Sequence, residues 1–338
     1  MTSLQGGPQA GRSPPRFSRD VLDLDCASAA RAIEEFIRHT VGRQLHRRGA
    51  VVAVSGGVDS AVCATLAARA LGPERVLGLL LPERDASPDG TMRARKLCEG
   101  LGIGCEVEDI TPVLESLGCY RRRDEAIRKL FPEYGPGYRQ KIAVADDLVG
   151  QDRVNYFSLI IEPPDGRQSK QRMPLDVYLA VVAATNMKQR VRKLLEYYYA
   201  ERLNYAVVGT PNRLEYDLGF FVRGGDGLAD LKPIAHLYKT QVYAMARHLD
   251  LPDEICRRVP TTDTYSLPQT QEEFYFALPY DRMDLALYAF RHDVPAVEAG
   301  PVLSLTAEQV ERVYRDIVAK KRTAALLHQQ ALLVENVE

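Results

Sequence analysis

The segment that most constrains this chain is an apolar run followed by a glycine pair and an alanine-rich stretch, residues 51–71. Residues 51–54 are small and mostly β-branched, as is typical of a strand buried on both faces of a parallel sheet. Residues 61–71 contain neither Gly nor Pro and predict a helix. A strand, a glycine-rich turn and a helix in this order present backbone N–H groups and the positive end of a helix to an anion. The sequence therefore predicts an anion site between the strand and the helix.

The connecting turn, Ser55-Gly56-Gly57-Val58-Asp59-Ser60, has the residues that a phosphate site needs. Two glycines allow close approach of the backbone, so that successive N–H groups can form a concave nest for phosphate oxygens. Asp59 would repel a phosphate unless a divalent cation lay between them, and Mg²⁺ prefers such a combination of carboxylate and phosphate oxygens. The GxxxxGK[ST] loop is excluded, because its lysine and its spacing are missing.

Strands alternate with helices over most of the chain. We expect further strands at 76–81, 105–110 and 205–208, and helices at 23–45, 91–101, 112–117, 177–199, 240–250, 254–259, 281–290 and 307–330. This alternation predicts an α/β fold, a doubly wound parallel sheet with helices on both faces, and a ligand at the carboxyl ends of the strands.

The pattern weakens over residues 119–176, which we interpret as an inserted segment. A short strand is expected at 155–161, a tight turn at 163–166, and a returning arm of a hairpin at 173–175. We expect the basic run at 120–123 to be a solvated face; the alternative is a partner surface within an oligomer. The prediction is one domain over 18–330, preceded by a disordered tail at 1–17.

Composition excludes several classes of function. The net charge of −1 argues against sequence-independent binding of nucleic acid. No apolar run approaches the roughly 20 residues that span a bilayer, and the first 16 residues have no apolar core of a secretory signal. The six cysteines form no CxxC pair, so we expect reduced thiols in a cytoplasmic protein.

The turn at 55–60 resembles the SGGxDS pyrophosphate loop of the PP-loop ATP pyrophosphatases, which cleave ATP between the α- and β-phosphates. Four later segments narrow this resemblance to the NAD⁺ synthetases, in the order of that family and close to its spacing. They are residues 208–215, 225–233, 237–242 and 260–263. With the helix at 186–192, the resemblance covers about residues 28–118 and 177–325.

The resemblance implies ATP-dependent amidation of deamido-NAD⁺ to NAD⁺, with release of AMP and pyrophosphate. A carboxylate does not take up ammonia, because hydroxide is a poor leaving group. Transfer of AMP from ATP to the carboxylate makes a mixed anhydride that reacts with ammonia, because AMP leaves readily. Nothing in the sequence resembles a glutaminase domain, so the ammonia would arrive free or from a separate glutaminase. The resemblance also implies a homodimer.

The family pattern assigns roles in the ATP half of the reaction. The pyrophosphate cradle would be Ser55, Gly56, Gly57, Asp59 and Ser60. Mg²⁺ would be held by Asp59 and Glu215. The other contacts to ATP would come from Thr210, Lys239 and Thr261.

The substrate half is assigned in the same way. Deamido-NAD⁺ would contact Arg190, Arg223, Asp230, Lys320 and Lys321. Asp226 would lie near the nicotinate end, where a carboxylate could bind ammonium or accept its proton. The catalytic residues would thus be Asp59, Lys239 and Asp226.

Two departures from the pattern keep an alternative open. The family's acidic residue near 271 is here Gln271, and its His-Lys pair is here Lys320-Lys321. The alternative is a PP-loop amide ligase that adenylates a different carboxylic acid. A nucleotide-binding protein that has lost catalysis is disfavoured by the intact site residues, and a tRNA-modifying enzyme by the absence of Cys pairs and of a basic excess.

Overall fold

The computed structural model describes residues 17–144, 157–261, 264–276 and 278–335. Its central sheet has four parallel strands in the order β3 (Gly104–Val107), β2 (Val76–Leu80), β1 (Gly49–Ala53) and β7 (Tyr205–Val208). The register places Val51 opposite Leu77 on one side and Val207 on the other. The predicted parallel sheet is confirmed.

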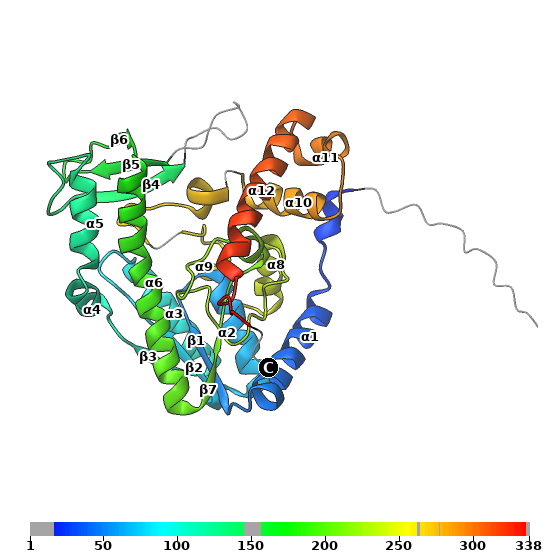
Figure 1. Ribbon diagram of the computed structural model, residues 1–338. Coiled ribbons are helices and arrows are strands. Elements are labelled where there is room, and N and C mark those ends of the chain that lie inside the picture. The colour runs from blue at the N-terminus through cyan, green and yellow to red at the C-terminus, as the bar shows by residue number, and fades with distance from the viewer. Residues whose placement is uncertain (1–16, 145–156, 262–263, 277, 336–338) are drawn as a thin grey trace, which may run out of the picture.

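Helices cover both faces of this sheet, as the alternation of elements predicted (Figure 1). Alternate residues such as Ala50 and Val52 belong to the core formed with α1 (Cys26–His39), α2 (Val58–Leu71), α3 (Pro88–Leu101) and α8 (Lys239–His248). Val51 faces the opposite core, formed with α4 (Thr111–Ser116) and α6 (Leu175–Leu203). Side chains of a strand alternate between faces, which is why one apolar run supplies both cores.

The strand order places the ligand crevice. The chain passes from β1 to β2 and β3 on one side, whereas β7 pairs with the other side of β1. Connections therefore diverge at the carboxyl ends of β1 and β7, which is where open α/β sheets bind ligands. The 55–60 turn follows β1 at this point.

The inserted segment forms a second, antiparallel sheet of β4 (Arg139–Val144), β5 (Phe157–Glu162) and β6 (Ser169–Arg172), next to α5 (Cys119–Arg128). The hairpin and its turn at 163–166 were predicted, but the returning arm is 169–172 and not 173–175. Pro174, which has no N–H to donate, ends the arm and directly precedes α6. In Figure 1 the long helix α6 runs from this sheet down to β7.

The basic run at 120–123 is only partly a solvated face, so that expectation was wrong for two of its residues. Arg121 and Arg122 are exposed, whereas Tyr120 and Arg123 are each 4% exposed. All four lie on α5, where residues three apart share a side of the helix. The buried side faces Glu83 and Asp85, which receive hydrogen bonds from it.

Helices from the C-terminal half build a further core beside the sheet. It contains residues of α7 (Arg213–Leu218), α10 (Tyr280–Arg291), α11 (Ala296–Leu303) and α12 (Ala307–His328). Phe17 is buried in this core against Tyr288, so the predicted tail ends before it; residues 1–16 lie outside the described residues. The loop expected at 260–273 follows the short helix α9 (Asp253–Cys256), and its last two residues belong to a helical turn at Glu272–Phe276.

Several boundaries and elements differ from the prediction. The helix expected at 23–45 is α1 followed by a wider turn at Thr40–Gln44, and α6 extends further at both ends than 177–199. Strand β4 and helices α5, α7 and α11 were not predicted. All six cysteines are free, as expected, and none of the helices in the described ranges is long and apolar enough to cross a bilayer.

Candidate active site

The 55–60 turn is closed by its own side chains. Ser60 Oγ donates to the carbonyl of Gly57 at 3.0 Å and accepts from the Ser55 N–H at 3.3 Å, and Ser55 Oγ accepts from the Gly57 N–H at 3.3 Å. Gly56 has φ of +78°, and a Cβ there would lie 2.5 Å from the carbonyl oxygen of Gly90. Only glycine fits this position, so the turn is a fixed loop at the start of α2.

Asp59 is the centre of the polar contacts beyond this loop. The Lys239 ammonium donates to its Oδ2, and the Asn212 amide donates to its Oδ1 at 3.0 Å. The side chain of Lys239 is 1% exposed and that of Asp59 is 17% exposed. Burial alone would lower the pKa of Lys239, but the Asp59 and Glu215 carboxylates outweigh it and raise that pKa. Lys239 is therefore a charged donor aimed at the loop.

Glu215 is held by the first turn of α7. It forms a capping box with Asn212: each backbone N–H is accepted by the other side chain, both at 3.2 Å. Burial, followed by the nearby Asp59 carboxylate, raises the pKa of Glu215 to about 8. Two carboxylates thus crowd one another at this site, as expected where a divalent cation binds between them. The described residues contain no cluster of three or more His, Cys, Asp or Glu that would hold a metal without further ligands.

A cavity opens in front of Asp59 and brings several expected ATP-binding residues together. It is lined by Ser55, Gly57, Val58, Asp59, Lys239, Tyr243, Arg258, Pro260, Thr261 and Gln271. Thr210, two residues after β7, follows the strand adjacent to β1 at the same edge of the sheet.

Two cavity residues, Tyr243 and Arg258, were not predicted. Tyr243 is four residues after Lys239 on α8, so both can face the cavity. Arg258 Nη2 donates to Thr261 Oγ1 at 2.8 Å. The sequence signal for Arg258 was its position two residues before the Pro260-Thr261 segment, but that position alone does not distinguish a site residue from an exposed surface arginine.

Asp284 is a further supporting residue that was missed. It is fully buried on α10, and its carboxylate accepts from the backbone N–H of Lys239 at 3.2 Å and of Thr240 at 2.7 Å. It therefore caps the first turn of α8 and fixes the start of the helix that carries Lys239. The available signal was one carboxylate within an otherwise apolar stretch, Met283 to Ala286.

Three residues assigned to the substrate half, Arg190, Arg223 and Asp226, lie on α6 and on the loop that follows α7. Arg190 Nε donates to the carbonyl of Arg223 at 3.3 Å, and Arg223 Nη2 donates to the carbonyl of Gln329 at 2.9 Å. Both arginines are exposed. Asp226 is exposed in the same loop and accepts from the N–H of Val222 at 2.7 Å.

Asp230 and the lysine pair have partners within the protein. Asp230 accepts from the N–H of Val207 at 2.8 Å and from the hydroxyl of Tyr197 at 3.1 Å. Lys320 Nζ donates to Asp316 at 2.7 Å and to the carbonyl of Tyr275 at 2.6 Å. Burial lowers the pKa of Lys320, opposed by Asp316. Lys320 and Lys321 both lie on α12, and Lys321 is half-buried.

Comparison with known proteins assigns this arrangement to a family. A model of the NAD synthase family matches residues 29–131 and 138–325. The chain belongs to the NAD synthase family. The resemblance inferred from the sequence segments is thereby confirmed.

Individual relatives span nearly the whole chain. It is 54% identical over 322 residues to the NH(3)-dependent NAD(+) synthetase of Rhizobium meliloti (strain 1021), covering 95% of this chain and 96% of that protein. It is 36% identical over 278 residues to the NH(3)-dependent NAD(+) synthetase of Thermotoga neapolitana, covering 82% of this chain and 87% of that protein.

Solved structures share the fold of this family member. The NMN synthetase of Francisella tularensis superposes with a TM-score of 0.62 at 22% identity, covering 92% of this chain and 99% of that one. The NH3-dependent NAD synthetase of Campylobacter jejuni superposes with a TM-score of 0.60 at 20% identity, covering 93% and 100%.

Proposed function

We propose that this chain is a ligase that forms NAD⁺ from deamido-NAD⁺ and ammonia at the expense of ATP, with AMP and pyrophosphate as the other products. Family membership and the 54% identical relative support the reaction. The single structural observation that carries it is the meeting of Asp59, Lys239 and Thr261 at one cavity beside the glycine loop.

The ATP half follows from the charges of this cavity. The loop at 55–60 supplies backbone N–H groups and hydroxyls for the β- and γ-phosphates, and Lys239 supplies a buried positive charge. Negative charge grows on the departing pyrophosphate as the carboxylate attacks the α-phosphate. Donors fixed before the reaction stabilise that charge without reorganising. Thr210 and Thr261 would contact the nucleotide from the neighbouring loops.

Mg²⁺ fits the two carboxylates of this site. Asp59 and Glu215 would hold it. Burial, followed by the nearby Asp59 carboxylate, raises the pKa of Glu215 to about 8, and a cation between the two carboxylates would favour their charged forms. Bound there, the metal would neutralise phosphate charge.

The acid substrate would lie across α6 and the loop at 219–231, with Arg190 and Arg223 as cationic contacts. Asp226 would accept the proton of ammonium, because ammonia attacks only in its neutral form. Asp230 would support this loop through its bond to the N–H of Val207. Lys320 and Lys321 would reach the substrate from α12.

A second candidate is the amidation of another carboxylic acid by the same ATP half. Lys320 stands at a position of the family's His-Lys pair. Its ammonium group already donates hydrogen bonds to Asp316 and to the Tyr275 carbonyl. If this contact persists with substrate bound, one recognition group of the substrate half is missing.

The deciding experiment supplies purified protein with ATP, Mg²⁺, ammonium and deamido-NAD⁺ and measures NAD⁺ and AMP together. The two products should appear in equal amounts. Asp59→Asn should reduce kcat/KM by at least about 100-fold, since it removes a metal ligand and the partner of Lys239. Asp176→Asn, at a 68% exposed carboxylate on α6, is the matched control. AMP formed only with another acid would favour the second candidate.

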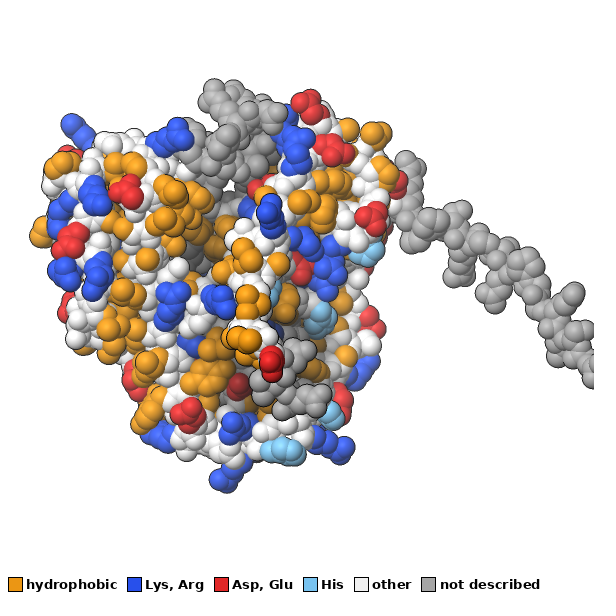
Figure 2. Space-filling view, in the orientation of Figure 1, with side chains coloured by type: hydrophobic (Ala, Val, Ile, Leu, Met, Phe, Trp, Pro, Cys, Tyr) orange, Lys and Arg blue, Asp and Glu red, His pale blue; other side chains and the backbone are white. Residues whose placement is uncertain are grey.

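We also propose that the protein is a homodimer. Leu175 and Leu179, near the start of α6, are 71% and 55% exposed, and Leu194 and Tyr198, near its end, are 66% and 50% exposed. Hydrophobic side chains are visible along α6 in Figure 2, where basic and acidic side chains are otherwise interspersed. Burial of such a row against a second copy is a common way to complete an apolar helix face.

A further inference from the structure

A buried group of charged side chains lies where the inserted segment meets the central sheet. We call it the insertion cluster: Glu83, Asp85, Tyr120, Arg123 and Lys188. Glu83 and Asp85 follow β2, Lys188 is on α6, and the other two are on α5. The side chains of Lys188, Glu83, Asp85 and Arg123 are 1%, 0%, 8% and 4% exposed.

Each carboxylate in the insertion cluster receives one donor from α6 and one from α5. Lys188 Nζ donates to Glu83 at 2.9 Å and to Asp85 at 2.7 Å. Tyr120 donates its hydroxyl to Glu83 at 2.8 Å, and Arg123 Nη1 donates to Asp85 at 2.5 Å. Burial would raise the pKa of Asp85, but Lys188 and Arg123 outweigh it and lower that pKa. The segment after β2 is thus fixed by charge from two sides.

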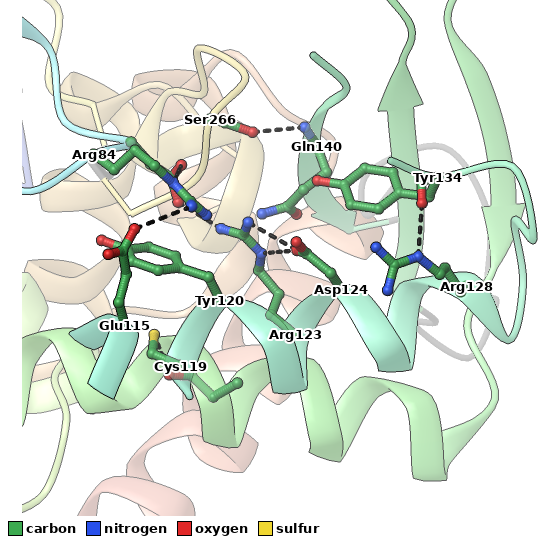
Figure 3. Close-up of polar contacts among 12 residues, drawn as sticks. Arg84, Glu115, Cys119, Tyr120, Arg123, Asp124, Arg128, Tyr134, Gln140 and Ser266 are labelled. Atoms are coloured by element: carbon green, nitrogen blue, oxygen red, sulfur yellow. Dashed lines mark hydrogen bonds and ion pairs between the residues drawn. The ribbon is translucent and has the colours of Figure 1, made fainter. Parts of the chain in front are cut away.

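Arg123 also contacts residues outside the insertion cluster. Its Nε donates to Asp124 at 2.8 Å, and in Figure 3 its guanidinium extends from α5 toward that of Arg84. The Arg84 guanidinium carbon lies 3.7 Å from the centre of the Tyr120 ring. Cations over an aromatic face are stabilised by its quadrupole, so Arg84, Tyr120 and Arg123 form one packed unit.

Two segments next to the ATP cavity are attached to the insertion cluster. The segment that begins with Glu83 and Asp85 continues to Gly90, which abuts Gly56 in the phosphate loop. On the other side, Lys188 Nζ donates to the carbonyl of Thr264, three residues after the cavity residue Thr261.

Strand β4 of the inserted segment holds the same second loop further along. The N–H of Gln140 donates to Ser266 Oγ at 2.8 Å, a contact drawn in Figure 3, and its carbonyl accepts from the N–H of Leu267 at 3.0 Å. Gln269 Nε2 donates to the carbonyl of Ile142 at 2.5 Å. The loop returns to the cavity at Gln271.

We propose that the inserted segment positions the two loops of the ATP cavity, and that Arg123 is a positioning residue for ATP. The proposal rests on the proposed use of ATP. Arg123 is not among the residues that line the cavity; it acts by holding Asp85, and through it the segment that backs Gly56. Displacement of phosphate-binding groups by about 1 Å can cost as much as about 100-fold in rate.

The test compares four variants of the full chain: Arg123→Met, Arg123→Lys, the double variant Asp85→Asn with Arg123→Met, and Arg122→Met. Arg122 is exposed on the same helix and is the matched control. Binding of α,β-methylene-ATP with Mg²⁺ is measured by titration calorimetry, and KM is measured for ATP and deamido-NAD⁺ separately.

Arg123→Met should weaken binding of the analogue and raise KM for ATP about tenfold, with KM for deamido-NAD⁺ changed by less than about threefold. Arg123→Lys keeps a positive charge but loses the planar guanidinium with its several donors. Its affinity for the analogue should therefore lie between those of Arg123→Met and the parent. The double variant removes both charges and should regain thermal stability without regaining nucleotide affinity.

The proposal would be overturned if Arg123→Met bound the analogue as tightly as Arg122→Met. It would also be overturned if the double variant recovered nucleotide affinity together with stability. If Arg123→Met does not fold, parental affinity in both Arg123→Lys and the double variant would overturn it. Parent protein that makes no NAD⁺ would refute the proposed reaction alone. The calorimetric comparison would still decide the role of Arg123, because it needs no turnover.

Discussion

At the scale of single residues, Gly56 is a position that accepts only glycine. Its positive φ excludes most side chains, and the carbonyl of Gly90 fills the space that a Cβ would take. Both restrictions hold the backbone of the loop in one conformation at the start of α2.

Gly56→Ala should therefore lower the free energy of unfolding by about 2 kcal/mol and raise KM for ATP at least about tenfold. Gly100→Ala in α3 is the matched control, since no heavy atom lies within 4 Å of its added Cβ. This second change should stabilise the helix by about 0.5–1 kcal/mol. Urea unfolding and steady-state kinetics measure both quantities; an unchanged KM in Gly56→Ala would contradict the fixed loop.

Asp284 shows how a buried carboxyl can support a site and still weaken the fold at neutral pH. Burial raises its pKa to about 6, although the N–H groups of Thr240 and Lys239 oppose the shift. The folded state therefore holds the proton more tightly than the unfolded chain. The resulting stabilisation is complete below the unfolded pKa, near 4, and is lost as the pH rises through about 6.

Asp284→Asn should remove this pH dependence. From pH 4 to pH 7 the stability of the parent should fall relative to the variant by up to about 3 kcal/mol, because the amide does not titrate. Urea unfolding at a series of pH values measures the difference. Parallel curves for the two proteins would show that the carboxyl has no raised pKa.

At the scale of elements, the short helix α7 connects the two carboxylates of the site. Asn212 caps its first turn through one side-chain atom and donates to Asp59 through the other. The same capping box fixes Glu215. One residue thereby sets the helix start and the relative position of both proposed Mg²⁺ ligands.

Two substitutions separate these roles. Asn212→Ala should lose the cap, at a cost of about 1 kcal/mol, together with the contact to Asp59. Asn212→Ser keeps a capping oxygen but has no amide to donate, so it should melt near the parent temperature. Both should need more Mg²⁺ for half-maximal rate. If Asn212→Ser had the parent's Mg²⁺ requirement, the contact to Asp59 would have no role in metal binding.

At the scale of the whole molecule, the sheet has a core on each face, and the inserted segment and the C-terminal helices each have a core of their own. Helix α6 contributes to one core of the sheet and to the core of the inserted segment. Helix α6 joins these parts, yet leaves leucines at both ends exposed. The proposed dimer would cover these leucines and so couple the inserted segments of two copies.

Leu194→Glu should convert the dimer to a monomer, because it places a charge in an apolar interface. Leu332→Glu, at an 83% exposed residue after α12, should leave the assembly unchanged. Light scattering after size-exclusion chromatography gives the mass of each. A monomeric parent would refute the proposed dimer and leave the proposed reaction untouched.

The sequence by itself determined the parallel sheet, the glycine loop and the family. The family followed from the resemblance of several motifs, whereas the sheet and the loop depend on local requirements: small β-branched residues in a buried strand, glycine at a positive φ, and a helix start beside an anion. Residues 51–60 carry all of them within ten adjacent residues. Such requirements are visible wherever the residues are neighbours in the chain.

Only the tertiary structure decided which charges meet. Lys239 lies 180 residues from Asp59, and Asn212 lies 153 residues from it. Arg123 has the same side chain as the exposed Arg122, and only the packing of α5 on the central fold makes one a buried partner of Asp85. Burial and charge pairing over such separations depend on the whole fold, because the local sequence does not specify what lies across the interface.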